Sequence, residues 1–414
     1  MLKLTDEQKR MCQGEYGAGV QKAMTMLVKY GNAYDAERMI RVDSAHTSPS
    51  IHPRFVSEVL AGVNDVRVPC TLHMTRICCT RWSKDVGINP QLAEEVCKQF
   101  NENMELFHKA GFFQTFTCVP FLTGTVIRKS MIFSWSESSA VLAGNSIFGA
   151  MGNRDGPPMS LCSAITGFTP EMLLHKPENR YAELLVHING LDVENLNYAD
   201  LGALGFYIGA QARDRKVAVT GLPPRLTYEE LKYFITPMAV SGAVALCHVV
   251  GVTPEAPTVE AALHNRAAQE TISVGKKELE EGYRSLNTAK TDDIDTVLFG
   301  CPHVTISEIK EIARLLDGKK VKEGVRLWVL ASDTMYALAK RNGYVDIINR
   351  AGGLVITDTC ISDHFYGLYG LAEDPKNVAT NSAKAAGYHV RRLGVRFGST
   401  EQCIAAAIKG KWGG

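Results

Sequence analysis

The sequence predicts an α/β fold built on a parallel sheet, and three observations support this. Residues 296–299 form a short apolar run rich in β-formers, which predicts a buried strand. A glycine and a proline end the run, and Thr305 with Glu308 three positions later has the pattern of a capping box that begins a helix. Apolar runs and helical patterns alternate over residues 325–357, as in parallel strands joined by helical crossovers.

The composition excludes several classes of protein. The chain has 414 residues, of which 45% are hydrophobic, and a net charge of +1, which allows two or three domains. We expect no nucleic-acid partner, because basic residues form no long run, and no membrane span, because no apolar stretch is long enough. The first ten residues are charged and lack the apolar core of a signal peptide. We therefore expect a cytoplasmic protein whose eleven cysteines serve as thiols rather than disulfides.

Three cysteines follow β-prone apolar runs: Cys118, Cys301 and Cys360. If the runs before Cys301 and Cys360 are parallel strands of one sheet, both thiols lie at its carboxyl edge, where such folds usually carry out chemistry. Three converging thiols without a fourth would suit an iron–sulfur cluster with one iron open to substrate. Alternatively, the cysteines are small apolar packing residues, because no CxxC spacing supports a metal site.

Other polar residues lie where a substrate could bind. Ser44 and His46 follow a predicted strand at residues 39–42; they could contact substrate, or cap and complete a turn. The basic segment 76–84 could bind a carboxylate or phosphate, or be a solvated loop. Ser382 and Lys384 begin a predicted helix, and a helix amino terminus attracts anions.

A set of motifs distributed along the chain, taken together, resembles the aconitase X family. These motifs are Phe116–Pro120, Trp135–Val141, Asn145–Ser146, Asn153–Arg154, Ala164–Pro170, Asp200–Gly205, His248–Glu255, Gly300–His303, Thr357–Cys360, Thr380–Lys384 and Arg396–Thr400. They cover nearly the whole chain in the order found in the family, and jointly they are highly specific.

The resemblance implies an aconitase-type catalytic body of layered αβα domains, without the swivelling domain. We expect an N-terminal region of residues 1–290 that contains Cys118, and a C-terminal region of residues 291–414 that contains Cys301 and Cys360. Because the chain stops at Trp412-Gly-Gly, it is similar to the large subunit of a heterodimer whose small subunit is the swivelling domain.

The resemblance also implies the chemistry. Family members dehydrate cis-3-hydroxy-L-proline, the preferred substrate here, or mevalonate 5-phosphate. Cys118, Cys301 and Cys360 match the family's cluster ligands, which implies a 4Fe–4S or 3Fe–4S cluster, with 2Fe–2S also compatible. The iron would act as a Lewis acid, and a serine on the small subunit would be the base.

On this chain the expected residues around the substrate fall into two groups. The catalytic candidates are Ser44, His46, Glu137 and Ser138. The substrate-binding candidates are Asn153, Arg154, Ser382 and Lys384, with Arg154 and Lys384 holding the anionic group.

The chain departs from the family pattern near His73, at Val126–Met131 and after Arg154. These segments belong to the expected substrate region, so the resemblance leaves the hydroxy acid open. Two other hypotheses remain: a non-catalytic iron–sulfur scaffold subunit, and a thiol enzyme that needs no iron.

Overall fold

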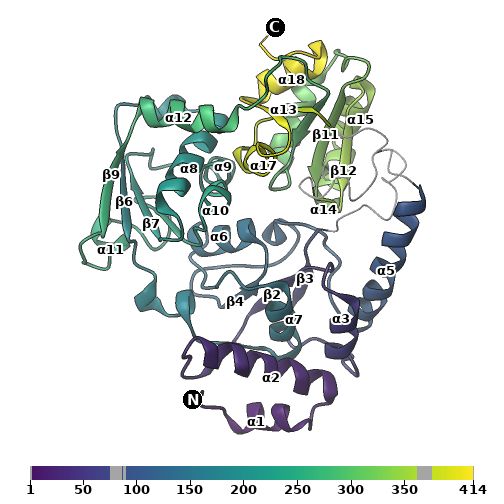
Figure 1. Cartoon of the computed structure of the whole chain (residues 1–414), viewed down its shortest axis with the longest axis vertical. Coiled ribbons are helices and arrows are strands. Elements are labelled where there is room, and N and C mark those ends of the chain that lie inside the picture. Colours follow the sequence, from purple (N-terminus) through teal and green to yellow (C-terminus); the bar gives the residue numbers. More distant parts are fainter. Residues whose placement is uncertain (1, 75–85, 87–89, 361–374, 414) are drawn as a thin grey trace. The chain divides into compact units, whose positions relative to one another are not determined.

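The computed structural model describes residues 2–74, 86, 90–360 and 375–413 (Figure 1). The described chain forms two compact units: the first contains residues 2–74 and 91–180, and the second contains residues 181–413 together with residues 86 and 90. No helix in the described ranges is sufficiently long and apolar to cross a membrane. The proposed division after residue 290 stays a prediction.

The first unit is organised around a three-stranded parallel sheet of order β3-β2-β4. A separate antiparallel pair joins β1 to β5. The elements of this unit are α1 (Asp6–Gln13), α2 (Ala18–Ala33), β1 (Met39–Arg41), β2 (Ser44–Thr47), α3 (Pro53–Val59), β3 (Cys70–Leu72), α5 (Pro90–Lys109), β4 (Phe133–Trp135), α6 (Ser138–Ser146), α7 (Pro157–Thr166) and β5 (Phe168–Pro170). Helices α2 and α7 pack against each other, and their apolar faces bury Met24, Leu27 and Leu161 in the core.

The second unit contains two parallel sheets. The first has the order β8-β7-β6-β9 and is formed with the helices that lie between its strands in sequence. Its elements are β6 (Leu184–Ile188), α8 (Tyr198–Ala212), β7 (Val217–Thr220), α9 (Tyr228–Ile235), α10 (Met238–Ser241), β8 (Cys247–Val249), α11 (Val259–Ala262), β9 (Glu270–Val274) and α12 (Lys276–Leu286).

The second sheet of this unit is parallel throughout, with the order β12-β11-β10-β13-β14. Its elements are β10 (Thr296–Phe299), α13 (Ile306–Leu316), β11 (Arg326–Ala331), α14 (Asp333–Arg341), α15 (Tyr344–Ala351), β12 (Leu354–Thr357), β13 (Asn377–Thr380), α17 (Ala383–His389), β14 (Gly394–Phe397) and α18 (Thr400–Lys409). Side chains of α13, α14, α15 and α18 form one apolar cluster with side chains of its strands, and Figure 1 shows these elements in green to yellow. Strands β10, β11 and β12 are rich in apolar residues and mostly buried, as expected for a parallel sheet covered by helices.

Most elements match the sequence prediction, but three expectations are wrong. Ser44–Thr47 is itself a central strand, not the turn after one. Residues 112–118 make only an isolated bridge, between Phe113 and Thr71, because Phe116 has a left-handed backbone (φ +40°) that interrupts a strand. Cys97 on α5 is disulfide-bonded, contrary to the expectation of thiols only.

Gly205 allows α8 to approach α9 closely. A Cβ atom at this position would lie 1.8 Å from the carbonyl oxygen of Phe234, which belongs to the backbone of α9 and cannot rotate away. We expect Gly205→Ala to lower the free energy of unfolding by about 1–3 kcal/mol, the usual cost of overpacking. Urea denaturation would measure this. Gly156→Ala is the control, since its Cβ would lie 3.8 Å from the nearest atom; equal losses in both variants would contradict the close-packing argument.

Candidate active site

Cys301 and Cys360 lie at the same edge of the five-stranded sheet. Cys301 follows β10 after a single glycine, and Cys360 comes shortly after the end of β12. Strand β11 lies between these two strands and pairs in parallel with both, so their carboxyl ends share one edge. The predicted placement of this pair at one sheet edge is therefore confirmed, whereas the role of the two cysteines as ligands stays a prediction.

Gly300 shapes the turn that presents Cys301. Its φ is +105°, and a Cβ atom there would lie 2.3 Å from the carbonyl oxygen of Leu330. Only glycine tolerates both the backbone conformation and the close approach. The backbone thus leaves β10 abruptly and places the thiol in the loop before α13.

Two contacts tie the cysteine loops to each other and to the loop after β13. The Nε2 atom of His303 lies 3.0 Å from the carbonyl oxygen of Thr359, the residue before Cys360. The hydroxyl of Ser382 donates a hydrogen bond to the carbonyl oxygen of Cys301. The structure therefore brings Cys301, Cys360 and Ser382 together at one sheet edge.

Ser382 and Lys384 both belong to the start of α17. The Ser382 oxygen caps this helix by accepting a hydrogen bond from the backbone N–H of Ala385 at 3.1 Å. Lys384 is buried, and its Nζ atom lies 5.9 Å from the centre of the Tyr388 ring. Lys384 follows Ser382 by two residues, and the Ser382 hydroxyl contacts the Cys301 carbonyl, so this buried lysine belongs to the loop that meets the Cys301 loop.

In the first unit, His46 lies on the central strand β2, fully buried. Its Nδ1 atom is 2.8 Å from the hydroxyl oxygen of Thr71, and its ring centre is 5.8 Å from that of His73. Burial, and secondly the neighbouring charge of His73, lower the pKa of His46 to about 3. The imidazole is therefore neutral near pH 7, so it serves as a hydrogen-bonding group and not as a proton donor.

The other candidates of this unit flank the same strand. Ser44 accepts a hydrogen bond from the indole Nε1 of Trp135 at 3.2 Å. Glu137 caps α6, with its carboxylate accepting from the backbone N–H of Ala140 at 2.6 Å and from the hydroxyl of Ser138 at 3.3 Å. Because β4 pairs in parallel with β2, Glu137 and Ser138 follow β4 at the sheet edge at which β2 also ends.

Cys118 is buried beside this edge. The backbone N–H of Thr117 donates to the carbonyl oxygen of Leu72, the last residue of β3, at 3.2 Å. The backbone of Thr117 also interacts with the His46 ring. The thiol thus lies next in sequence to a residue that contacts two strands of the first-unit sheet.

Asn153 and Arg154 differ in their surroundings. The Asn153 amide nitrogen donates to the Met172 carbonyl at 3.1 Å, and its oxygen accepts from the Leu174 N–H at 2.8 Å. Asn153 therefore holds backbone in place, and its binding role stays a prediction. Arg154 is exposed and forms no ion pair within residues 2–74, 90–360 and 375–413.

Sequence reasoning missed Arg180, which is 1% exposed. Its guanidinium donates to the side-chain oxygen of Asn145 at 3.1 Å and to the carbonyl oxygens of Leu174 and Ala150 at 3.1 and 3.0 Å. These hydrogen bonds hold in place the backbone of the segment that precedes Arg154. Nothing in the local sequence distinguishes this arginine from an exposed one.

Comparison with known proteins then shows the family. Models of the first, second and third domains of aconitase X match residues 1–178, 182–284 and 294–409. The chain belongs to the aconitase X family. The crystal structure of Thermococcus kodakaraensis aconitase X in its holo-form matches 98% of this chain and 100% of that one, with a TM-score of 0.85 and 34% identity. The fold is therefore the aconitase-type arrangement of layered domains.

Two names recur among the curated relatives that match nearly all of this aconitase X chain. The phosphomevalonate dehydratase large subunit of Methanocaldococcus jannaschii is 35% identical over 97% of this chain and 99% of that relative. The cis-3-hydroxy-L-proline dehydratase of Pseudomonas aeruginosa is 30% identical over 96% of this chain and 68% of that relative. Both names describe dehydratases, and this aconitase X chain is accordingly a hydro-lyase.

The donor set of this aconitase X chain fits an iron–sulfur cluster in its chemistry. Cys118, Cys301 and Cys360 form no disulfides, and thiolates are the usual ligands of iron–sulfur clusters. Two of them are at one sheet edge of the second unit, and the third belongs to the first unit. Among the described residues no three His, Cys, Asp or Glu side chains form a ready-made metal site.

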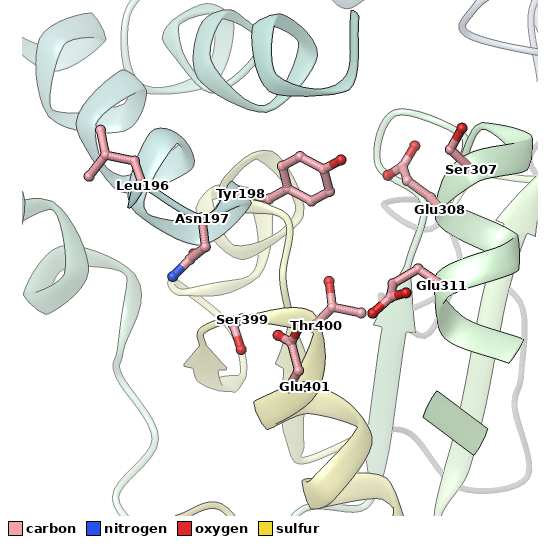
Figure 2. Close-up of a pocket in the computed structure, with 9 residues that line it drawn as sticks. All are labelled: Leu196, Asn197, Tyr198, Ser307, Glu308, Glu311, Ser399, Thr400 and Glu401. Carbon is pink, nitrogen blue, oxygen red and sulfur yellow. The ribbon is translucent and has the colours of Figure 1, made fainter. Parts of the chain in front are cut away.

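The described residues also line two pockets that contain none of the three cysteines. One in the first unit, of about 590 Å³, is lined by Ser44, Thr71 and the exposed Phe113. One in the second unit, of about 370 Å³, lies where α8, α13 and α18 begin, and Figure 2 shows Tyr198, Glu308 and Thr400 facing it. The basic segment 76–84, which was a candidate anion site, lies outside the described residues.

Proposed function

We propose that this chain is the large, catalytic subunit of a two-chain iron–sulfur dehydratase that acts on a small β-hydroxy carboxylic acid. The observation that carries the proposal is the pair Cys301 and Cys360 at one sheet edge, in a chain whose full-length relatives are named dehydratase large subunits. The name of those relatives implies a small subunit, and we propose that a swivelling domain plays that part here.

Cys118, Cys301 and Cys360 are the proposed ligands of the cluster. A 4Fe–4S cluster held by these three thiolates would supply Lewis-acid activation of the hydroxyl that leaves. The contact of the Ser382 hydroxyl with the Cys301 carbonyl supports a role for Ser382 in holding the Cys301 loop in place. Ser382 therefore has two proposed roles, which are to bind substrate and to hold the Cys301 loop in place.

The remaining candidates have separate proposed roles in binding the substrate. Lys384 and Arg154 are the proposed partners of the substrate's anionic groups, because a lysine or arginine pairs with carboxylate or phosphate. His46, neutral at working pH, offers an uncharged hydrogen bond near Glu137 and Ser138. The proposed base that removes the carbon-bound proton is a serine of the small subunit, so this chain alone binds without turning over.

Two substrates fit one reaction. cis-3-Hydroxy-L-proline and mevalonate 5-phosphate each carry a hydroxyl on the carbon β to a carboxylate, so each can lose an α-proton and the β-hydroxide. We propose cis-3-hydroxy-L-proline as the substrate, as the resemblance to the family suggested. Mevalonate 5-phosphate is the alternative substrate, and the match along the full length of phosphomevalonate dehydratase large subunits supports it.

Turnover by the anaerobically reconstituted pair tests the proposal. The chain is co-expressed with its small subunit, iron and sulfide are quantified, and loss of each substrate is followed by mass spectrometry. We expect one substrate to be dehydrated only when both subunits and iron are present. A cluster without dehydration of either acid would instead support a non-catalytic iron–sulfur scaffold, and dehydration by iron-free protein would support a thiol enzyme.

A further inference from the structure

A buried polar network in the second unit connects helix α9 to the loops around Cys301. Its centre is Glu308 on α13, which is 6% exposed. Lys232 on α9 forms a buried ion pair with this carboxylate. The neighbouring Tyr233 donates its hydroxyl proton to Glu308 Oε1 at 2.7 Å, so two consecutive residues of α9 bind one carboxylate.

The network reaches the Cys301 loop through the start of α13. The second oxygen of Glu308 accepts a hydrogen bond from the backbone N–H of Thr305 at 2.8 Å. Thr305 caps α13 and ends the loop that begins at Cys301. The carboxylate that α9 holds therefore fixes one end of the cysteine loop.

The network reaches the second loop through Asn381. The Asn381 amide nitrogen donates to the Tyr233 hydroxyl oxygen at 2.9 Å and to the Thr400 hydroxyl oxygen at 2.9 Å. Asn381 immediately precedes Ser382, whose hydroxyl binds the Cys301 carbonyl. The Tyr233 hydroxyl thus accepts from one loop while it donates to the carboxylate that holds the other.

The ring of Tyr233 is fixed as well as its hydroxyl. It stacks on Tyr198, with ring centres 4.6 Å apart and planes inclined by 5°. Tyr198, Glu308 and Thr400 face one pocket (Figure 2), whereas Tyr233 is not among the residues that line it and is 6% exposed. A fixed ring leaves the hydroxyl little freedom, which suits a residue that sets the spacing of two loops.

We propose that Tyr233 is a positioning residue that sets the relative placement of the Cys301 loop and the Asn381–Lys384 loop. Its role in catalysis rests on the proposed function, but its role in loop placement does not. Tyr233 is remote in sequence from both loops and touches no reacting group. It acts through Glu308 on one side and through Asn381 on the other.

Tyr233→Phe is the sharpest test, because it removes only the oxygen that joins the two arms and keeps the ring and the net charge. Tyr283→Phe is the matched control. Tyr283 also donates to a carboxylate of this unit, Asp200 Oδ1, at 2.8 Å, and its partners lie in neither loop.

The first measurement needs neither cluster nor substrate. Iron-free protein is alkylated with iodoacetamide, and the rate at Cys301 is followed by peptide mass spectrometry, with Cys12 as an internal reference. We expect Tyr233→Phe to raise the Cys301 rate about tenfold, the equivalent of about 1.4 kcal/mol, which is within the range of about 0.5–1.5 kcal/mol for the net contribution of one intramolecular hydrogen bond. We expect no change at Cys12 or in Tyr283→Phe.

The second measurement uses the reconstituted two-subunit enzyme. We expect Tyr233→Phe to raise KM and lower cluster retention after dilution, both by several-fold, while Tyr283→Phe behaves as wild type. An unchanged Cys301 alkylation rate, or an equal rise in Tyr283→Phe, would overturn the proposal. Failure of the wild-type enzyme to dehydrate either acid would overturn the proposed function and leave the alkylation result to stand by itself.

Discussion

Cys301→Ser is expected to abolish cluster binding and to lower dehydratase activity by more than about 100-fold, because even changes beside the ligands of a metal site cost 10–100-fold. The serine oxygen is a harder donor than a thiolate and suits iron–sulfur clusters poorly. The hydrogen bond from Ser382 goes to the backbone carbonyl of residue 301, so the loop keeps that contact in the variant. The loss would therefore report on the thiol itself.

The measurement combines iron and sulfide content, electron paramagnetic resonance and turnover, in protein purified anaerobically with its small subunit. Cys12→Ser is the control, since Cys12 is a partly buried thiol of the first unit that is not a proposed ligand. A Cys301→Ser enzyme that retained full iron content would exclude Cys301 as a ligand. The same comparison for Cys118→Ser and Cys360→Ser tests the rest of the set.

The second large effect concerns Asp155, the residue after Arg154. Its carboxyl group is buried and accepts a hydrogen bond from the Ser134 hydroxyl at 2.8 Å, while its Oδ1 atom has no partner among the described residues. Burial raises the pKa of Asp155 to about 7, against weaker opposing effects of Ser134 and Tyr30. The folded protein therefore holds a proton that the unfolded chain releases near pH 4.

This pKa difference makes stability fall as the pH rises. Below pH 4 Asp155 is protonated in both states, and above pH 7 it is ionised in both, so the loss occurs between these values. Its full size is on the order of 4 kcal/mol, at 1.36 kcal/mol per pH unit. We expect Asp155→Asn, which stays neutral, to remove this slope and to be more stable than wild type at pH 8.

Thermal unfolding at a series of pH values between 4.5 and 8.5 would measure the effect. The stabilisation at pH 8 will be smaller than the full slope, because the new amide places a donor where the unpartnered oxygen lies, at a cost of about 1–3 kcal/mol. Asp317→Asn, an exposed aspartate of the second unit, should leave the slope unchanged. A slope that persists in Asp155→Asn would show that another group carries the proton.

Local signals in the sequence predicted the second-unit site well. The Thr305–Glu308 capping box and the strands before Cys301 and Cys360 are formed as expected. Such signals succeed because a strand, its stop and a helix cap depend on neighbours only a few residues away. The shared edge then follows from parallel topology.

The first unit was harder to predict, because its strands are three or four residues long. A strand of this length has too few positions to show an alternating pattern. His46 was therefore expected after a strand, either contacting substrate or completing a turn, and it lies instead on the central strand, where burial lowers its pKa. The segment before Cys118 was expected to be a strand and is irregular.

By itself the sequence determined the α/β class, the capping box at Thr305 and the cysteines at the ends of two strands, because each depends on residues close together in the chain. Only the tertiary structure decided that Glu308 is held by Lys232 and Tyr233, that Arg180 clamps backbone, and that Asp155 keeps a proton. These properties come from burial and from partners distant in sequence. Charge, hydrogen bonding and pKa respond to that environment, which no local pattern of residues records.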